Sequence, residues 1–151
     1  MNKLYHIFYV SDYKGGELHS TTNLTFEKLA GEVDLDIDEL REIFADDERS
    51  QNISDEEWDK LTDLELVKLL PDDVIEEAIE RYFYPGNIYA FDTRSDYEIY
   101  ETSENGELKE INPCEIPGFT QLVKDNLIKI IEKYGSYSCI NSIRRRKSSL
   151  A

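Results

Sequence analysis

Histidine and cysteine are scarce in this chain of 151 residues, which contains two of each. Cys114 and Cys139 lie far apart and outside any CxxC pattern, a distribution that favours reduced thiols over a disulfide or a metal site. His19 starts a His-x-Thr triplet of the kind found in two-histidine phosphoesterases, but His6, the other histidine, is followed by two apolar residues. The sequence therefore predicts no catalytic residues, no metal site and no cofactor.

Long apolar runs and phosphate-binding loops are also missing. No window approaches 18 uninterrupted apolar residues, and the amino terminus has no apolar signal region, so we expect a cytoplasmic protein without a membrane span. The glycines at Lys14-Gly15-Gly16 are not followed by the lysine and Ser/Thr of a P-loop. Asp34, Asp36 and Asp38 are spaced like the start of a calcium loop, but the required Gly and Glu are replaced by Glu39 and Ala45, which favours a helix start.

Basic residues are few in one third of the chain. Residues 31–80 hold twenty Asp/Glu against four Lys/Arg, and the remainder holds thirteen of each, so this block carries the whole net charge of −16. With 40% hydrophobic and 11% aromatic residues, the chain is too apolar to be a disordered acidic tail. We expect a folded acidic surface that repels nucleic acid and attracts proteins that normally bind it.

The order of periodic segments predicts an α+β fold. Leu4 to Val10 and Glu17 to Leu24 are expected to form an N-terminal β-hairpin, and a short helical turn capped by Thr25 follows. The acidic block is then expected to form helices. The first of these helices is predicted to start at Asp36 with Glu39. The second is predicted to start at Ser54 with Glu57 and to continue to Pro71, and the third to run from about Asp72 to Phe83.

The last third of the chain is predicted to form three more strands and one helix. The strands are expected at Ile88–Asp92, Tyr97–Thr102 and Glu107–Ile111, and the final helix from about Phe119 to Tyr134. We expect a single domain over residues 1–143, with an acidic helical lobe at about 31–84 and a basic, flexible tail at 144–151.

Carboxylates without interleaved lysine follow one face of the third helix. Asp73, Glu76, Glu77 and Glu80 cover about 10 Å of helix, or one charge per about 2.6 Å. Duplex DNA has one charge per about 1.7 Å counting both strands, and one per about 3.4 Å on each strand. A solvated helix face is the alternative interpretation. The further partner-binding candidates are Asp46, Asp47, Glu48, Asp55, Glu56 and Glu57, whereas Trp58 is expected in the core.

A short segment at the first hairpin resembles the ArdA antirestriction family. In Tyr13-Lys14-Gly15-Gly16-Glu17-Leu18-His19-Ser20, the residues Tyr13, Gly16, Leu18 and His19 match a family pattern of roughly Tyr-Asn-x-Gly-x-Leu-His-Gly. Lys14 and Ser20 depart from it, and the Trp that follows in the family is absent. The resemblance implies a small acidic α+β protein that mimics duplex DNA, and acidic phage anti-CRISPR proteins are similar in size and charge.

Together these features predict a non-enzymatic inhibitor of a bacterial restriction enzyme or CRISPR effector, acting by DNA mimicry in the cytoplasm of the bacterial host. The expected partner is a nucleic-acid-binding protein with a basic groove, without direct DNA binding by this chain. The alternative is an acidic immunity or regulatory protein that plugs a basic toxin or enzyme without imitating DNA. The role of Arg144 to Lys147 stays open between nucleic-acid binding, folding back onto the acidic block and a frayed terminus.

Overall fold

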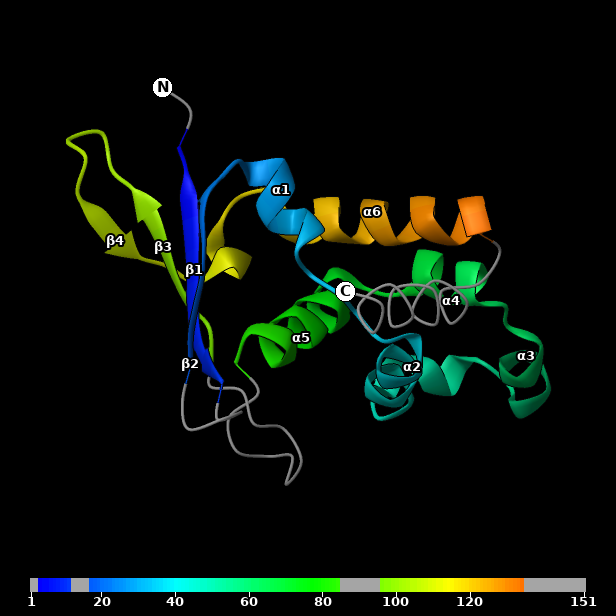
Figure 1. Cartoon of the computed structure of the whole chain (residues 1–151). Coiled ribbons are helices and arrows are strands. Elements are labelled where there is room, and N and C mark those ends of the chain that lie inside the picture. Colours follow the sequence, from blue (N-terminus) through cyan, green and yellow to red (C-terminus); the bar gives the residue numbers. More distant parts are fainter. Residues whose placement is uncertain (1–2, 12–16, 85–95, 135–151) are drawn as a thin grey trace. The chain divides into compact units, whose positions relative to one another are not determined.

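A computed structural model describes residues 3–11, 17–84 and 96–134 of the chain (Figure 1). Its internal contacts define two compact units. The sheet unit comprises Met1–Asp34 and Ile79–Leu122, and the helical unit comprises Leu35–Ala78 and Val123–Ala151. The single domain over residues 1–143 stays a prediction, and the basic tail lies outside the described residues.

The sheet unit contains a four-stranded antiparallel sheet (Figure 1). Its strands, in the spatial order β2-β1-β3-β4, are β1 (Tyr5–Ser11), β2 (Glu17–Leu24), β3 (Glu98–Thr102) and β4 (Leu108–Glu110). The predicted α+β layout is confirmed, because strands and helices segregate along the chain. The N-terminal hairpin and the later strands share one sheet, since β1 pairs with β3 as well as with β2. The strand predicted at Ile88–Asp92 lies outside the described residues.

His6 has a structural role in this sheet. Between the pairs Tyr5↔Leu24 and Ile7↔Thr21 the register shifts, and Asn23 in this irregular stretch has a φ of 59°. The Asn23 backbone N–H donates to His6 Nδ1 at 3.1 Å, so Nε2 is the nitrogen that donates to Thr102 Oγ1, at 2.7 Å. The buried imidazole thus joins β1 to the strands on both sides of it.

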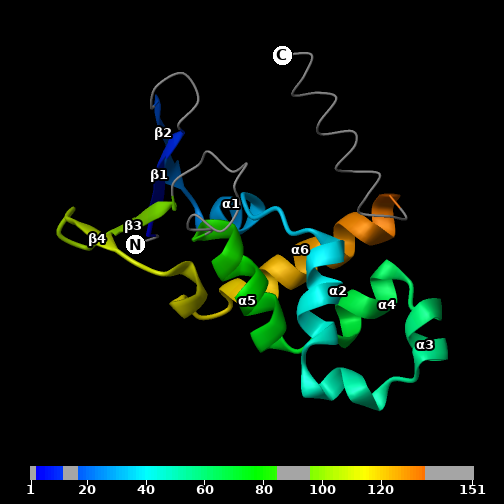
Figure 2. The same ribbon diagram turned by 90° about the horizontal axis from the view of Figure 1, so that it is seen from below.

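Side-chain caps define the first helices as the sequence predicts. Helix α1 (Phe26–Gly31) starts after Thr25, whose Oγ1 accepts from the Lys28 N–H at 3.2 Å. Helix α2 (Ile37–Ala45) starts after Asp36, whose Oδ1 accepts from the Asp38 N–H at 2.9 Å. The short 3-10 helix η1 (Glu48–Asn52) follows α2, as Figure 2 shows.

The predicted continuous helix from Ser54 to Pro71 is wrong, because the chain forms two short helices there (Figure 2). These are α3 (Asp55–Lys60) and α4 (Asp63–Leu69). Leu61 between them is extended, with a ψ of 121°. Thr62 starts α4, since its Oγ1 accepts from the Glu65 N–H at 3.1 Å and donates to Glu65 Oε1 at 3.0 Å. Thr62 and Glu65 repeat the Ser/Thr-x-x-Glu spacing of Ser54 and Glu57, although the Glu65 carboxylate accepts from the Thr62 hydroxyl rather than from its backbone N–H, and the apolar spacing concealed this helix start.

Helices α5 (Asp72–Phe83) and α6 (Phe119–Tyr134) have the predicted bounds. The apolar spacing predicts that Val74, Ile75, Ala78, Ile79 and Tyr82 share one face of α5, and of these the first four are buried and Tyr82 is half-buried. On α6 the buried residues are Phe119, Val123, Leu127 and Ile131. The apolar spacing of this helix in the sequence also predicts burial of Leu122, Ile130 and Tyr134. That prediction is wrong, because the first two are half-buried and Tyr134 is 49% exposed. Within the described ranges, no helix has both the length and the apolar character needed to cross a membrane.

Candidate partner-binding surface

Most of the ten predicted partner-binding carboxylates are accessible. Asp47 and Glu76 are half-buried, and the other eight residues are exposed. The exposed set is Asp46, Glu48, Asp55, Glu56, Glu57, Asp73, Glu77 and Glu80. Their accessibility satisfies the first condition for a surface that contacts another protein.

Arg49 engages two of these carboxylates in the helical unit. Its Nη2 lies 2.7 Å from Asp47 Oδ2 and 2.9 Å from Asp73 Oδ2. Hydrogen bonds from Arg49 lower the pKa of Asp47 to about 2 and also lower the pKa of Asp73. The three side chains together carry a charge of only −1. Asp73, a leading candidate on α5, is thus already paired with a cation of the same chain.

The segment of residues 46–59 contains carboxylates of a different kind. It holds seven Asp/Glu and one Arg, a net charge of −6, and we call it the acidic segment. Lys60 pairs with Glu56 at 3.4 Å. Among the described residues, nothing forms a hydrogen bond or an ion pair with the carboxylates of Asp46, Glu48, Asp55, Glu57 and Asp59. These charges are available to a partner.

Local structure holds the acidic segment in place. The Asp47 carboxylate caps η1 by accepting from the Arg49 N–H at 2.9 Å, and Ser54 Oγ caps α3 by accepting from the Glu57 N–H at 3.1 Å. The Trp58 indole stacks on the buried Phe44 ring, with centroids 6.0 Å apart and planes 16° from parallel. The unpaired carboxylates thus lie on or beside capped helices, and the contact between Trp58 and Phe44 joins α3 to α2.

An open pocket lies within the acidic segment, at η1 and α3. It has a volume of about 390 Å³ and is lined by Ala45, Ser50, Gln51, Ile53, Asp55 and Trp58. Trp58 lines this pocket and is only half-buried, and the prediction that it is simply a core residue misses this. The signal in the sequence is a single tryptophan among carboxylates, an unusual position for the largest apolar side chain.

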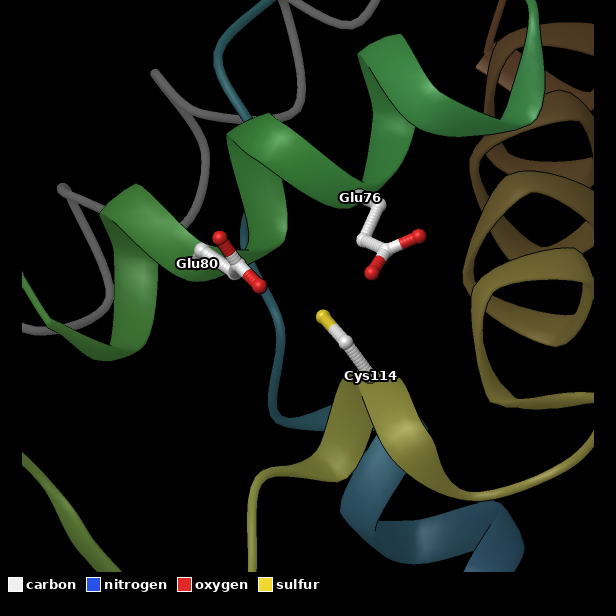
Figure 3. A group of neighbouring side chains, drawn as sticks. All are labelled: Glu76, Glu80 and Cys114. Atoms are coloured by element: carbon white, nitrogen blue, oxygen red, sulfur yellow. The ribbon is translucent and has the colours of Figure 1, made fainter.

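A second group of acidic side chains belongs to α5. Glu80 lies near Cys114 of the 3-10 helix η2 (Pro113–Glu115), with their ligand atoms within 4.8 Å, and Glu76 lies one turn before Glu80 on α5 (Figure 3). Burial, together with the nearby Cys114, Glu110 and Glu80, raises the pKa of Tyr84 to about 12. Exposed carboxylates gather in this way on many acidic surfaces, so the arrangement assigns no metal or catalytic chemistry.

The ArdA-like segment is only partly described. Tyr13 and Gly16 lie outside the described residues. Leu18 is 68% exposed on β2, and the His19 ring stacks on Tyr9 with centroids 4.7 Å apart. A pocket of about 330 Å³ beside this hairpin is lined by Phe8, Tyr9, Val10, Leu18, Asp96 and Glu98. This lining includes no Ser, Cys, Lys or His that would pair with its two carboxylates in a catalytic arrangement.

Comparison of the chain with protein-family models, with curated proteins and with solved structures gives no significant match. The function of this protein is therefore inferred from its own residues.

Proposed function

We propose that this protein is a non-enzymatic inhibitor of a bacterial nucleic-acid-targeting defence system, such as a restriction enzyme or a CRISPR effector, and that it acts by DNA mimicry. The observation that supports this most is the acidic segment, with its net charge of −6 and five carboxylates that no described residue engages. A protein selected for stability alone would pair more of these charges, because like charges repel within a helix and its neighbours.

The mechanism is competition for a basic groove. A nuclease or effector that binds DNA uses Lys and Arg side chains to displace the counterions of the phosphates. The acidic segment offers those side chains carboxylates on a folded surface, so inhibitor and DNA exclude one another. Binding of this kind weakens as salt is added, because the attraction between exposed charges is screened.

The carboxylates of the acidic segment support this proposal better than those of α5. On α5, Asp73 is paired with Arg49 and Glu76 is half-buried. In the acidic segment, Glu48, Asp55 and Glu57 are exposed and have no described partner. A partner that binds these three carboxylates breaks no existing ion pair. Its attraction to them is therefore not offset by the loss of an ion pair within this chain.

A second candidate function is an acidic immunity or regulatory protein that plugs a basic toxin or enzyme without imitating DNA. The observation that favours it is the pocket at Trp58, since a plug concentrates its contacts around one anchor whereas a mimic spreads them in rows. In both cases the partner is a basic protein. The two differ in whether nucleic acid and this protein can bind the partner together.

The test compares two triple variants of equal net charge. One is Glu48→Gln with Asp55→Asn and Glu57→Gln in the acidic segment, and the control is Glu27→Gln with Glu104→Gln and Glu107→Gln at exposed positions of the sheet unit. Each is used to recover proteins from a bacterial lysate at low and high salt. The recovered proteins are identified, purified and assayed for nucleic-acid cleavage.

We expect wild type and the control, but not the acidic-segment variant, to recover a nucleic-acid-binding enzyme at low salt and to inhibit it in competition with DNA. Partners without nucleic-acid binding, or equal recovery by both triple variants, would contradict the proposal. An inhibited enzyme that still binds its nucleic acid would favour the plug. Circular dichroism of the variants confirms that α3, which loses two first-turn carboxylates, still folds.

A further inference from the structure

We propose that the pocket at Trp58 receives an arginine side chain of the partner protein. This assignment deepens the proposed function and rests on it, since it names the group that the acidic segment recognises. The pocket is lined by residues from the end of α2, from η1 and from α3, all within the helical unit. Its volume of about 390 Å³ is many times the roughly 30 Å³ that one water occupies in the liquid, so a whole side chain fits.

Trp58 supplies the wall on which a guanidinium group stacks. Tryptophan is the strongest aromatic partner of a cation, and arginine makes such contacts more often than lysine. The indole is held by its stacking on Phe44, which is only 2% exposed. The aromatic surface that lines the pocket is therefore ordered before the partner arrives, and little side-chain entropy is lost on binding.

Asp55 supplies the counter-charge. Asp55 lines the same pocket, and its carboxylate is exposed and has no partner among the described residues. Asp55 is the first residue of α3, after the Ser54 cap, where the helix dipole favours a negative charge. A planar guanidinium can donate two parallel hydrogen bonds to one carboxylate while its face lies against an aromatic ring, whereas a lysine ammonium is a point charge.

Ser50, which also lines the pocket, can act there as a hydrogen-bond acceptor. Its hydroxyl hydrogen is directed to backbone oxygens, with Oγ 2.7 Å from Asp47 O and 3.2 Å from Ala45 O. The lone pairs of Oγ are then left to accept from an incoming N–H. With Asp55, and with the net charge of −6 over residues 46–59, the polar atoms of the pocket favour a donor-rich cation over an anion.

The arginines of the helical unit nearest in sequence are already engaged. Arg49 binds Asp47 and Asp73, and Arg41 Nη2 donates to Leu61 O at 2.9 Å and lies 3.3 Å from Asp63 Oδ1. An arginine from another protein therefore does not have to displace either of them from its carboxylate. The chain's own Arg144, Arg145 and Arg146 lie outside the described residues and enter the test below.

The test titrates the full-length protein with a hexa-arginine peptide and, separately, with a hexa-lysine peptide of equal charge. Trp58 is the only tryptophan of the chain, so its indole N–H resonance and its fluorescence report on this pocket alone. Three variants are compared with wild type. Asp55→Asn removes the counter-charge, Ala45→Met fills the pocket without changing the charge, and Glu57→Gln is the control on the same helical turn but outside the lining.

We expect hexa-arginine to shift the Trp58 resonance and to bind more tightly than hexa-lysine. Asp55→Asn and Ala45→Met should each lower the affinity for the arginine peptide by about fivefold or more, and Glu57→Gln should lower it by about twofold or less. Equal effects of Asp55→Asn and Glu57→Gln, with no effect of Ala45→Met, would overturn the assignment, because binding would then depend on charge alone. A Trp58 shift in the free protein when Arg144, Arg145 and Arg146 are replaced by Gln would also overturn it, since the tail would then fill the pocket.

These outcomes separate the pocket from the proposed function. If the peptides behave as expected but the acidic-segment variant recovers its partners like wild type, the pocket binds arginine, but the partner does not use it and the proposed function is contradicted. If the acidic-segment variant loses its nucleic-acid-binding partner while the peptides do not distinguish the pocket variants, the function stands and the arginine assignment is overturned.

Discussion

At the scale of single residues, the structure separates carboxylates that the sequence treats alike. Asp47, Asp73 and Asp55 are all aspartates of the acidic block, and each is flanked by another acidic residue. Arg49 binds the first two, and no described residue binds the third. The difference depends on which side chains the fold brings within reach of the guanidinium, because Arg49 and Asp73 are 24 positions apart.

The Arg49 ion pairs predict a dependence of stability on acid pH. Because Arg49 lowers the folded-state pKa of Asp47 from 3.8 to about 2, its contribution is complete above 3.8 and is lost as the pH falls towards 2. Asp73 shifts in the same direction. We expect Arg49→Gln to be less stable than wild type near neutral pH and the difference to shrink over this acid range. Urea denaturation of both proteins across the range measures it, and a difference independent of pH would contradict the ion pairs.

His6 gives a second prediction at this scale. His6→Ala should lower the free energy of unfolding by roughly 1–3 kcal/mol, because it removes hydrogen bonds to Asn23 N–H and to Thr102 Oγ1 in a buried position. His19→Ala, at a half-buried site on β2, is the matched control and should cost less. Thermal unfolding of both variants measures the effect. Recovery of the proposed nucleic-acid-binding partner by folded His6→Ala is expected to be unchanged, since the imidazole is structural.

At the scale of elements, capping residues decide where the helices of the acidic block begin. Thr62 interrupts an apolar spacing that is otherwise compatible with one helix from Ser54 to Pro71. The local hydrogen bonds between Thr62 and Glu65 compete successfully with continuation of the helix, and the intervening Leu61 becomes extended.

Thr62→Ala should therefore destabilise the helical unit by about 0.5–2 kcal/mol, the usual cost of losing a helix cap. Thr22→Ala, at an exposed site on the edge strand β2, serves as the control that changes the same side chain without removing a cap. Chemical denaturation followed by circular dichroism gives both values. A Thr62→Ala variant as stable as the control would show that the cap is not what starts α4.

Substitutions on α5 and α6 test which face of each long helix is buried. Ile79→Ala on α5 and Ile131→Ala on α6 should each cost about 2–5 kcal/mol, because both side chains are 2% exposed or less and leave cavities. Ile130→Ala, one position away on α6, should cost clearly less because Ile130 is half-buried. Thermal melts compare the three. Equal losses at Ile130 and Ile131 would place the buried face of α6 elsewhere.

At the scale of the whole molecule, net charge governs what the protein can approach. With a net charge of −16, the chain should not bind duplex DNA at physiological salt, because its field opposes the phosphates and the four basic residues at 144–147 cannot offset it. An electrophoretic mobility-shift assay with duplex DNA tests this at several salt concentrations. Sub-micromolar binding would contradict it and would direct attention to Arg144–Lys147.

The sequence alone determined the fold class, the concentration of charge in residues 31–80 and the bounds of α5 and α6. Apolar periodicity and local caps are properties of neighbouring residues, so they can be read without the fold. The N-cap residues Thr25, Asp36 and Ser54 were identifiable for the same reason. The sequence also located the carboxylates, although it could not rank them.

Only the tertiary structure decided which strands pair, which carboxylates stay unpaired and where Trp58 lies. The pairing of β1 with β3 joins residues ninety or more positions apart, and the Arg49–Asp73 ion pair joins two helices. The pocket is lined by residues close in sequence, between positions 45 and 58, but it depends on the turns that join α2, η1 and α3, which apolar spacing does not predict. The strand pairing and the Arg49–Asp73 ion pair depend on how packed elements bring distant side chains together. The pocket depends on the turns between three short elements, and for these reasons the sequence predicted an acidic surface but not its ion pairs or the pocket beside Trp58.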